Sequence, residues 1–235
     1  KQMLVQKVRE AERMRIYETF HEQIGEIRIS TTQQILRGDV IVNLGRAEGI
    51  LPTDEQIPGE RFRQGDTIRG YVRDVMRETK GPQVILSRKH PVFLERLFQL
   101  EVPEIYDGLV EIMAVARDPG NRAKVAVTSH DERIDPVGAC IGPKGSRVQA
   151  VVRELNNERI DIILWSPDPL QFLLNSLAPA EVDSVIVEEA TNTIIAIATE
   201  DQLSPAIGRG GQNVRLASML SGWRVEVLLE EQYQQ

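Results

Sequence analysis

Several kinds of residue are scarce in this chain of 235 residues, and each scarcity excludes a class of protein. A single cysteine, Cys140, cannot form a disulfide within the chain. Three scattered histidines, His21, His90 and His130, do not combine with that thiol into the Cys/His ligand set of a structural zinc site. No stretch approaches 18 uncharged apolar residues, and the charged N-terminus does not resemble a secretory signal. We therefore expect a cytoplasmic protein, not associated with a membrane, that needs neither a metal nor a cofactor.

Positive charge is also in short supply, because 28 Lys and Arg residues stand against 35 Asp and Glu, a net charge of −7. Taken alone, this total argues against nucleic-acid binding, since contacts of Lys and Arg to phosphate supply most non-specific affinity. The distribution differs from the total. The segment from Arg61 to Arg96 contains nine basic and four acidic residues and so carries a net charge of +5. The rest of the chain therefore carries a net charge of −12. Individually these cations are expected to be solvated, but as a cluster they could form part of an RNA track.

The first part of the chain predicts a helix followed by a small barrel. Residues 1–20 contain no Gly or Pro and place apolar side chains at helical spacing. Because the chain begins at Lys1 rather than Met, we expect this helix to trail from a missing N-terminal domain. Residues 25–87 then form short, β-branched runs separated by glycines, which predicts five strands. Five strands in a Greek key are the OB architecture, a frequent oligonucleotide binder.

The second part of the chain contains an internal repeat. Each copy predicts a helix, two strands joined by a turn, a second helix and a final strand. Residues 141–145 align with residues 207–211 at an offset of 66, and Ile160 and Ile162 align with Val225 and Val227 at an offset of 65. This agreement predicts a duplicated α/β unit.

Each copy places the pattern Gly-x-x-Gly immediately before an amphipathic helix. The two instances are Gly142-Pro143-Lys144-Gly145 and Gly208-Arg209-Gly210-Gly211. Glycines permit positive φ and close backbone approach, and the following helix offers unpaired N–H groups and a positive dipole end. A lone Gly-x-x-Gly is most often only a turn, but two at equivalent places favour contact with a sugar-phosphate strand. Neither copy matches the nucleotide-binding patterns G-x-x-x-x-G-K-[ST] or G-x-G-x-x-G.

These phrases resemble known RNA-binding domains. The segments DPVGACIGPKGSRVQAVVREL and LSPAIGRGGQNVRLAS resemble two tandem KH domains of the prokaryotic type (type II), and the preceding barrel resembles an S1-type OB domain. The order of helix, barrel, KH and KH resembles the central part of the NusA family of bacterial transcription factors. The resemblance implies an α+β multidomain fold with four parts: a trailing helix (1–23), a five-stranded S1-type β-barrel (24–89), a first KH domain (90–166) and a second KH domain (167–231).

The resemblance also implies a function without catalysis. It implies that the two GXXG loops bind single-stranded nascent RNA, about four nucleotides each, and that the protein modulates RNA polymerase pausing, termination and antitermination. The implied partners are single-stranded RNA, RNA polymerase, which is contacted mainly by regions missing here, and other antitermination factors; we expect a monomer. The residues that the resemblance assigns to RNA are Gly142, Pro143, Lys144, Gly145, Arg147, Gly208, Arg209, Gly210, Gly211, Asn213 and Arg215.

The barrel departs from the S1 pattern in one segment. Where S1-type domains generally carry G-x-x-H, this chain has Gly49-Ile50-Leu51-Pro52, and the adjoining strand over residues 39–44 has no aromatic residue. Base stacking, worth roughly 1–3 kcal/mol per base, is therefore largely missing from those positions. The barrel either binds RNA weakly through its arginines or serves protein contacts.

Two alternative functions remain beside RNA binding. Phosphorolytic exoribonucleases also carry KH and S1-type modules, but in the reverse order and with large catalytic domains. The other alternative is a protein-interaction scaffold of the transcription or antitermination complex with vestigial loops.

Asp161 and Glu226 occupy matching places in the last strands of the two copies and alternate with apolar residues, so we interpret them as solvent-facing and not as a carboxylate pair. We interpret Cys140 as a small buried residue.

Overall fold

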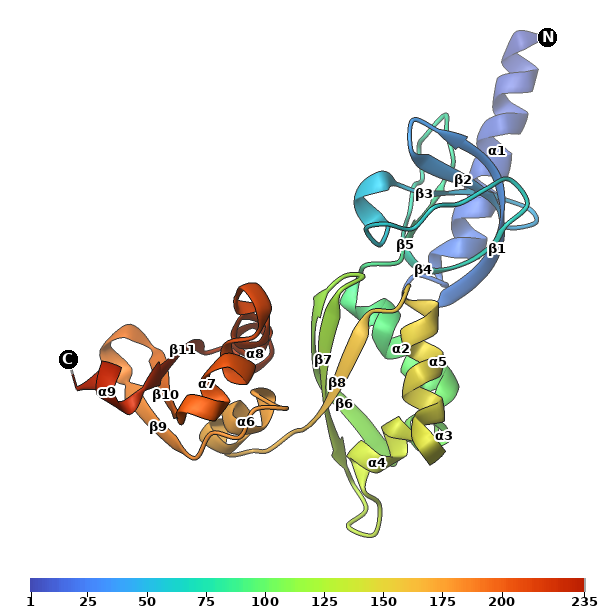
Figure 1. The fold of residues 1–235 in the computed structure, drawn as a ribbon. Coiled ribbons are helices and arrows are strands. Elements are labelled where there is room, and N and C mark those ends of the chain that lie inside the picture. Colours follow the sequence, from blue (N-terminus) through green and yellow to red (C-terminus); the bar gives the residue numbers. More distant parts are fainter. Residues whose placement is uncertain (235) are drawn as a thin grey trace. The chain divides into compact units, whose positions relative to one another are not determined.

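The computed structural model describes residues 1–234 and divides the chain into two compact units, the first over residues 1–96 and the second from residue 97 onward. The first unit contains a closed five-stranded barrel, and the second contains two three-stranded sheets with helices (Figure 1). This arrangement confirms the predicted α+β fold class with a barrel and two KH-like units. In the described part of the chain, no helix has the length and apolar character needed to cross a membrane.

The barrel is closed because its first strand, β1, pairs with β4. Its strand order is β1-β2-β3-β5-β4, with β3 and β5 parallel and the other pairs antiparallel. The elements are α1 (Gln2–His21), β1 (Ile27–Leu36), β2 (Asp39–Asn43), β3 (Glu48–Leu51), η1 (Thr53–Glu55), β4 (Thr67–Val75) and β5 (Val84–Ser87). Alternate residues of these strands point inward and form one apolar core, as period-two patterning requires.

Helix α1 is attached to the barrel through its second half only. Phe20 is buried in the barrel core, and Ile16 and Tyr17 pack against it. The Gln83 side-chain amide donates to the Arg13 carbonyl at 2.9 Å and to the Met76 carbonyl at 3.1 Å, which joins the helix to the end of β4. The first twelve residues are exposed.

The first KH unit follows the barrel, with helix α2 crossing the boundary between the two compact units. Its elements are α2 (Pro91–Glu101), α3 (Pro103–Tyr106), β6 (Val110–Asp118), β7 (Arg122–Ser129), α4 (Pro136–Ile141), η2 (Pro143–Gly145), α5 (Ser146–Glu154) and β8 (Arg159–Leu164). In the sheet, β7 lies between β6, which is antiparallel to it, and β8, which is parallel. Helices α4 and α5 lie on one face of this sheet (Figure 1).

The second KH unit repeats the same topology. Its elements are α6 (Pro169–Ser176), β9 (Ser184–Glu188), η3 (Glu189–Thr191), β10 (Thr193–Ala198), α7 (Glu200–Ile207), η4 (Arg209–Gly211), α8 (Gln212–Ser221), β11 (Arg224–Leu229) and α9 (Glu230–Tyr233). Strand β10 lies between antiparallel β9 and parallel β11. Helices α4 and α7 each end at the first glycine of a GXXG loop, and α5 and α8 each begin directly after the last glycine. The internal repeat predicted from the sequence is therefore confirmed as a structural repeat.

The second KH unit packs on the free face of the first sheet. Helix α8 contacts β6 and β7, and an apolar cluster is shared between the two units. From the first sheet it contains Ala116, Ala126 and Ile163, and from the second unit Phe172, Leu216 and Leu220. Both faces of β7 are consequently covered, and its first six residues are all buried.

The prediction that Asp161 faces solvent is wrong. Its carboxylate accepts hydrogen bonds from Arg122 at 2.6 Å and from Lys124 at 3.0 Å, and the Lys124 side chain is fully buried. Lys124 also donates to the Ala178 carbonyl of the second KH unit at 2.6 Å. Alternation correctly places Asp161 on the face opposite Ile160 and Ile162, but that face is covered by the second unit and not by water. Glu226, at the matching place in β11, is exposed as predicted.

Candidate nucleic-acid interface

The two GXXG loops have nearly the same backbone conformation. We call Gly142–Gly145 loop 1 and Gly208–Gly211 loop 2. The first glycine has φ and ψ of 76° and 173° in loop 1 and of 77° and 172° in loop 2. The last glycine has 75° and 13° in both. Since these positive φ values are unfavourable for most residues with a Cβ, both loops favour glycine at both ends.

The third position of each loop is also left-handed. Lys144 has a φ of 55°, and Gly210 at the equivalent place has 62°. A lysine in this conformation is strained by about 1–2 kcal/mol relative to the usual helical region. Strain of this kind is often found at binding sites, where the surrounding structure holds it. The strained Lys144 is exposed, so its ammonium group is free to meet an external anion.

Only the later glycines of the loops lie against open space. A Cβ added to Gly145, Gly210 or Gly211 would meet no atom within 4 Å. Gly145 and Gly211 precede α5 and α8 as their N-caps, and neither helix has a side chain capping its first N–H groups. The first N–H of each helix, that of Ser146 and of Gln212, donates to the carbonyl of Pro143 or Arg209 in the preceding loop. The N–H groups that follow have no side-chain cap from the glycine N-cap, and the positive end of each helix dipole lies at the loop.

Lys144, Arg209 and Arg215 are the exposed cations near these loops among the residues assigned to RNA by resemblance. Arg215 lies one turn into α8, and its Nη1 is 3.4 Å from the Gly210 carbonyl, at the outer limit of a hydrogen bond. The structure thus places these three cations at exposed positions in or beside the loops, where they are suited to contact phosphate. Pro143 and Gly210 are exposed as well, whereas the first and last glycines of each loop are half-buried.

Asn213 is a correction to the predicted set, because its side chain does not reach the surface. It is fully buried, and its Nδ2 donates to the Leu177 carbonyl at 3.0 Å and to the Ala206 carbonyl at 2.9 Å. A Cβ on Gly208 would come within 2.8 Å of the Asn213 Cβ. Asn213 therefore packs beneath loop 2 and is not exposed at the surface, contrary to the prediction.

Arg147, at the equivalent place in the first unit, is also engaged inside the protein. Its Nη1 donates to the Glu104 carboxylate at 2.8 Å and to the Ala139 carbonyl at 2.7 Å, and its side chain is 25% exposed. A Cβ on Gly142 would lie 2.5 Å from the Arg147 Cγ. Sequence reasoning missed Glu104, which lies 43 residues from its partner with no local signal of the contact.

The predicted cation track of the barrel is smaller than the count of nine suggested. Arg88 is buried, and its guanidinium donates to the Glu60 carboxylate at 2.9 and 3.1 Å and to the Arg69 carbonyl at 2.7 Å. Arg73 pairs with Glu55, and the Nε of Arg96 donates to the Gly25 carbonyl at 2.8 Å. The Arg77 guanidinium lies over the Tyr17 ring, 5.6 Å from its centroid. Four of the nine cations thus make contacts within the barrel unit. The RNA track stays a prediction that depends on the remaining ones.

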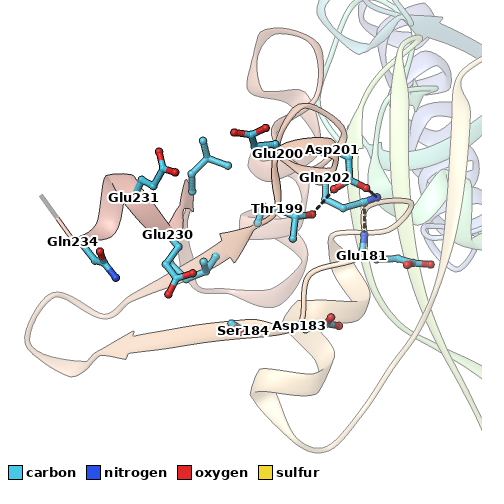
Figure 2. A pocket seen from close by; sticks show the side chains of 13 residues that line it. Glu181, Asp183, Ser184, Thr199, Glu200, Asp201, Gln202, Glu230, Glu231 and Gln234 are labelled. Carbon is cyan, nitrogen blue, oxygen red and sulfur yellow. Dashed lines mark hydrogen bonds between the residues drawn. The ribbon is translucent and has the colours of Figure 1, made fainter.

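Six acidic residues of the second KH unit line one pocket at the end of α7 opposite loop 2. Figure 2 shows a pocket at the N-terminal end of α7, lined among others by Glu181, Asp183, Glu200, Asp201, Glu230 and Glu231. Among the described lining residues there is no Lys or Arg. Because loop 2 follows the other end of this eight-residue helix, about 12 Å separates them along its axis at 1.5 Å per residue. The carboxylates at the N-terminal end of α7 therefore repel a phosphate bound at loop 2 less strongly than carboxylates beside the loop would.

Cys140 is buried in α4, as expected. Burial raises the pKa of its thiol to about 12, and the Glu104 carboxylate adds to that rise. The thiol is therefore protonated near neutral pH and has no nucleophilic role at this interface.

Comparisons with known proteins agree with this geometry. A model of the NusA-like first KH domain matches residues 88–165, and a model of the NusA-like second KH domain matches residues 169–235. The chain is 48% identical over 235 residues to the transcription termination/antitermination protein NusA of Rickettsia prowazekii. The chain belongs to the NusA family.

Other NusA relatives match to a similar degree. The chain is 47% identical to the NusA proteins of Halalkalibacterium halodurans and Bacillus subtilis, over 235 and 230 residues. These alignments cover 99% of the chain for the Rickettsia protein, 100% for the Halalkalibacterium protein and 98% for the Bacillus protein. The chain spans 47% of the Rickettsia protein and 62% of each of the other two. It thus corresponds to about half to three fifths of the length of these NusA proteins.

Proposed function

We propose that this chain binds single-stranded RNA through loop 1 and loop 2, without any chemical step. The observation that carries the proposal is the repeated geometry: two loops of nearly equal φ and ψ, each followed by a helix N-terminus that has no side-chain cap. Backbone N–H groups and the helix dipole attract phosphate without adding to a formal charge count. A net charge of −7 is therefore compatible with RNA binding at these loops.

We further propose that the RNA is the nascent transcript and that binding modulates pausing, termination and antitermination by RNA polymerase in the bacterial cytoplasm. The names of the relatives support this role, since each is a transcription termination/antitermination protein. RNA polymerase and other antitermination factors are the protein partners that follow. At about four nucleotides for each KH unit, the two loops together account for roughly eight nucleotides or more.

The proposal is tested by placing a carboxylate on each loop. In Gly145→Asp and Gly211→Asp the new side chain enters open space, so it adds negative charge where phosphate would approach without a clash inside the protein. Asp is also a favourable N-cap and tolerates the left-handed region better than most residues, so the helices should persist. We expect each variant to weaken binding of a fluorescent single-stranded RNA pool at least tenfold.

Gly222→Asp is a matched control for the second loop. Gly222 has a φ of 80° and open space around its Cβ position, but it ends α8, whereas Gly211 begins it. The control adds the same charge at the opposite end of the same helix and should leave affinity nearly unchanged. Unchanged affinity in both loop variants, with circular dichroism showing an intact fold, would refute RNA binding by the loops and favour the scaffold function.

A further inference from the structure

Each GXXG loop is supported from inside the protein by the side chain that lies two residues after its last glycine. These side chains belong to Arg147 in α5 and Asn213 in α8. We propose that they are positioning residues that set the conformation of loop 1 and loop 2 for RNA, and that neither is itself an RNA contact. This inference rests on the proposed function of the loops.

Arg147 joins three helices beneath loop 1. From α5, its Nη1 donates to the carbonyl of Ala139 in α4 at 2.7 Å and to the carboxylate of Glu104 in α3 at 2.8 Å. Helix α4 ends immediately before the loop, where its last carbonyls have no partner within the helix. Arg147 supplies one of the missing donors and at the same time fixes how α4 and α5 approach each other.

Asn213 makes the corresponding contacts beneath loop 2 with a different side chain. Its Nδ2 donates to the carbonyl of Ala206, near the end of α7, at 2.9 Å, and to the carbonyl of Leu177, which ends α6, at 3.0 Å. In both units the donor thus connects the helix before the loop to the helical segment that precedes the first strand. The shared position and the shared pattern of contacts indicate a shared structural role.

The first glycine of each loop fits against the same side chain. A Cβ on Gly142 would lie 2.5 Å from the Arg147 Cγ, and a Cβ on Gly208 would lie 2.8 Å from the Asn213 Cβ. These first glycines are therefore required by packing inside the protein, whereas Gly145 and Gly211 lie against open space. The inner side of each loop is held by the positioning residue, and the outer side is left for the ligand.

Loop conformation affects affinity because a loop that is already in its binding conformation loses less entropy when RNA binds. If Arg147 positions loop 1, removing Glu104 loosens the loop and weakens binding. If Arg147 instead contacts phosphate, removing Glu104 frees the guanidinium, deletes a nearby negative charge and strengthens binding. The two roles predict opposite signs for the same variant.

The first experiment is therefore Glu104→Ala in the whole chain, measured with the fluorescent single-stranded RNA pool. We expect affinity to fall roughly three- to tenfold, the loss associated with a loosened binding loop. Asp107→Ala is the matched control, because Asp107 is an exposed acid that ends the same short helix and is expected to leave affinity unchanged or slightly higher. An equal or higher affinity of Glu104→Ala would overturn the positioning role.

The second experiment separates positioning from contact by the dependence of affinity on salt. For single strands, each phosphate contact contributes about 0.7 to the slope of log affinity against log salt concentration. Lys144→Ala should therefore lower the slope by about 0.7. Arg147→Ala should weaken binding, but its slope should equal that of the unmodified chain. A slope that falls equally in both variants would show that Arg147 is a phosphate contact.

The third measurement combines Glu104→Ala with Arg147→Ala. Because the two residues act through one contact, the double variant should bind no more weakly than Arg147→Ala alone, whereas independent effects would add. The test is made at loop 1 because Asn213 is fully buried and its replacement endangers the fold. If Gly145→Asp and Lys144→Ala weaken binding but Glu104→Ala does not, only the positioning role fails. If none of these variants changes affinity, the proposed function fails with it.

Discussion

The ion pair between Arg117 and Glu158 in the first KH unit is buried on both sides, and its disruption is expected to have a large effect on stability. The Glu158 carboxylate accepts three hydrogen bonds, from Arg117 Nε at 2.9 Å, Arg117 Nη2 at 2.7 Å and the Gly120 N–H at 2.7 Å. The side chains of Arg117 and Glu158 are 1% and 0% exposed. Glu158→Gln keeps the size of the side chain. The amide NH₂ of the new glutamine would, however, point at one of these donors, and the buried Arg117 guanidinium would lose the negative charge that it pairs with.

Removing one partner of a buried ion pair costs about 3–5 kcal/mol, because the other charge stays buried without compensation. That is a large share of the roughly 5–15 kcal/mol that separates a folded domain from its unfolded chain. With a urea dependence of about 2 kcal/mol per M, the midpoint of unfolding should fall by roughly 1.5–2.5 M. Glu132→Gln, which neutralises an exposed carboxylate of the same unit, should change stability by less than about 0.5 kcal/mol.

Tryptophan fluorescence is a suitable assay for this variant. The chain has two tryptophans, and both lie in the second compact unit, Trp165 in the cluster shared by the KH units and Trp223 in the core of the second KH unit. Unfolding of the barrel therefore does not contribute directly to the signal. Replacing both partners, as in Arg117→Met with Glu158→Leu, should recover most of the lost stability, since no charge then stays buried. A midpoint shift below about 0.5 M for Glu158→Gln would refute the reasoning.

Two further predictions concern ionisable groups that the fold buries. Burial lowers the pKa of Lys124 to about 8 from 10.5, with Asp161 opposing the shift, so the unfolded chain holds more protons than the folded one between these values. In urea titrations, the free energy of unfolding of the unmodified chain, relative to that of Lys124→Met, should therefore rise as pH increases from 8 to 10.5. If the two proteins depend on pH in the same way, the lowered pKa of Lys124 is contradicted. Because burial raises the pKa of Cys140 to about 12, its thiol should react with a thiol reagent at pH 8 only after urea unfolding, and rapid labelling of the folded chain would show that the site is open.

The local chemistry of the loops was predictable from the sequence. Glycine at Gly145 and Gly211 is favoured by backbone conformation, which is a local property. The amphipathic helix after each loop follows from the spacing of its apolar residues. The repeat itself was visible because both copies keep the same order of elements. Such features depend on residues close together in the chain, and periodicity records them.

Contacts between distant segments were not predictable in the same way. Alternation assigned Asp161 to the face opposite Ile160 and Ile162, but nothing in the strand reveals that a second KH unit covers that face. Counting cations from Arg61 to Arg96 likewise could not show that Arg88 is buried against Glu60. The sequence shows the charge of a residue and its spacing from its neighbours. Burial depends instead on which distant segments of the chain pack against the residue.

The fold class, the internal repeat and the two GXXG loops with the cations Lys144 and Arg209 followed from the amino-acid sequence alone, because each arises from local spacing and residue type. Which residues near the loops face outward depends on tertiary packing. Arg147 and Asn213 occupy equivalent places in the sequence, and both lie beneath the loops because carbonyls at the ends of α4 and α7 need donors. Hydrogen-bond partners that lie far apart in the chain, such as Glu104 for Arg147, are brought together only by folding, and for this reason the sequence could not show that these two side chains are engaged inside the protein.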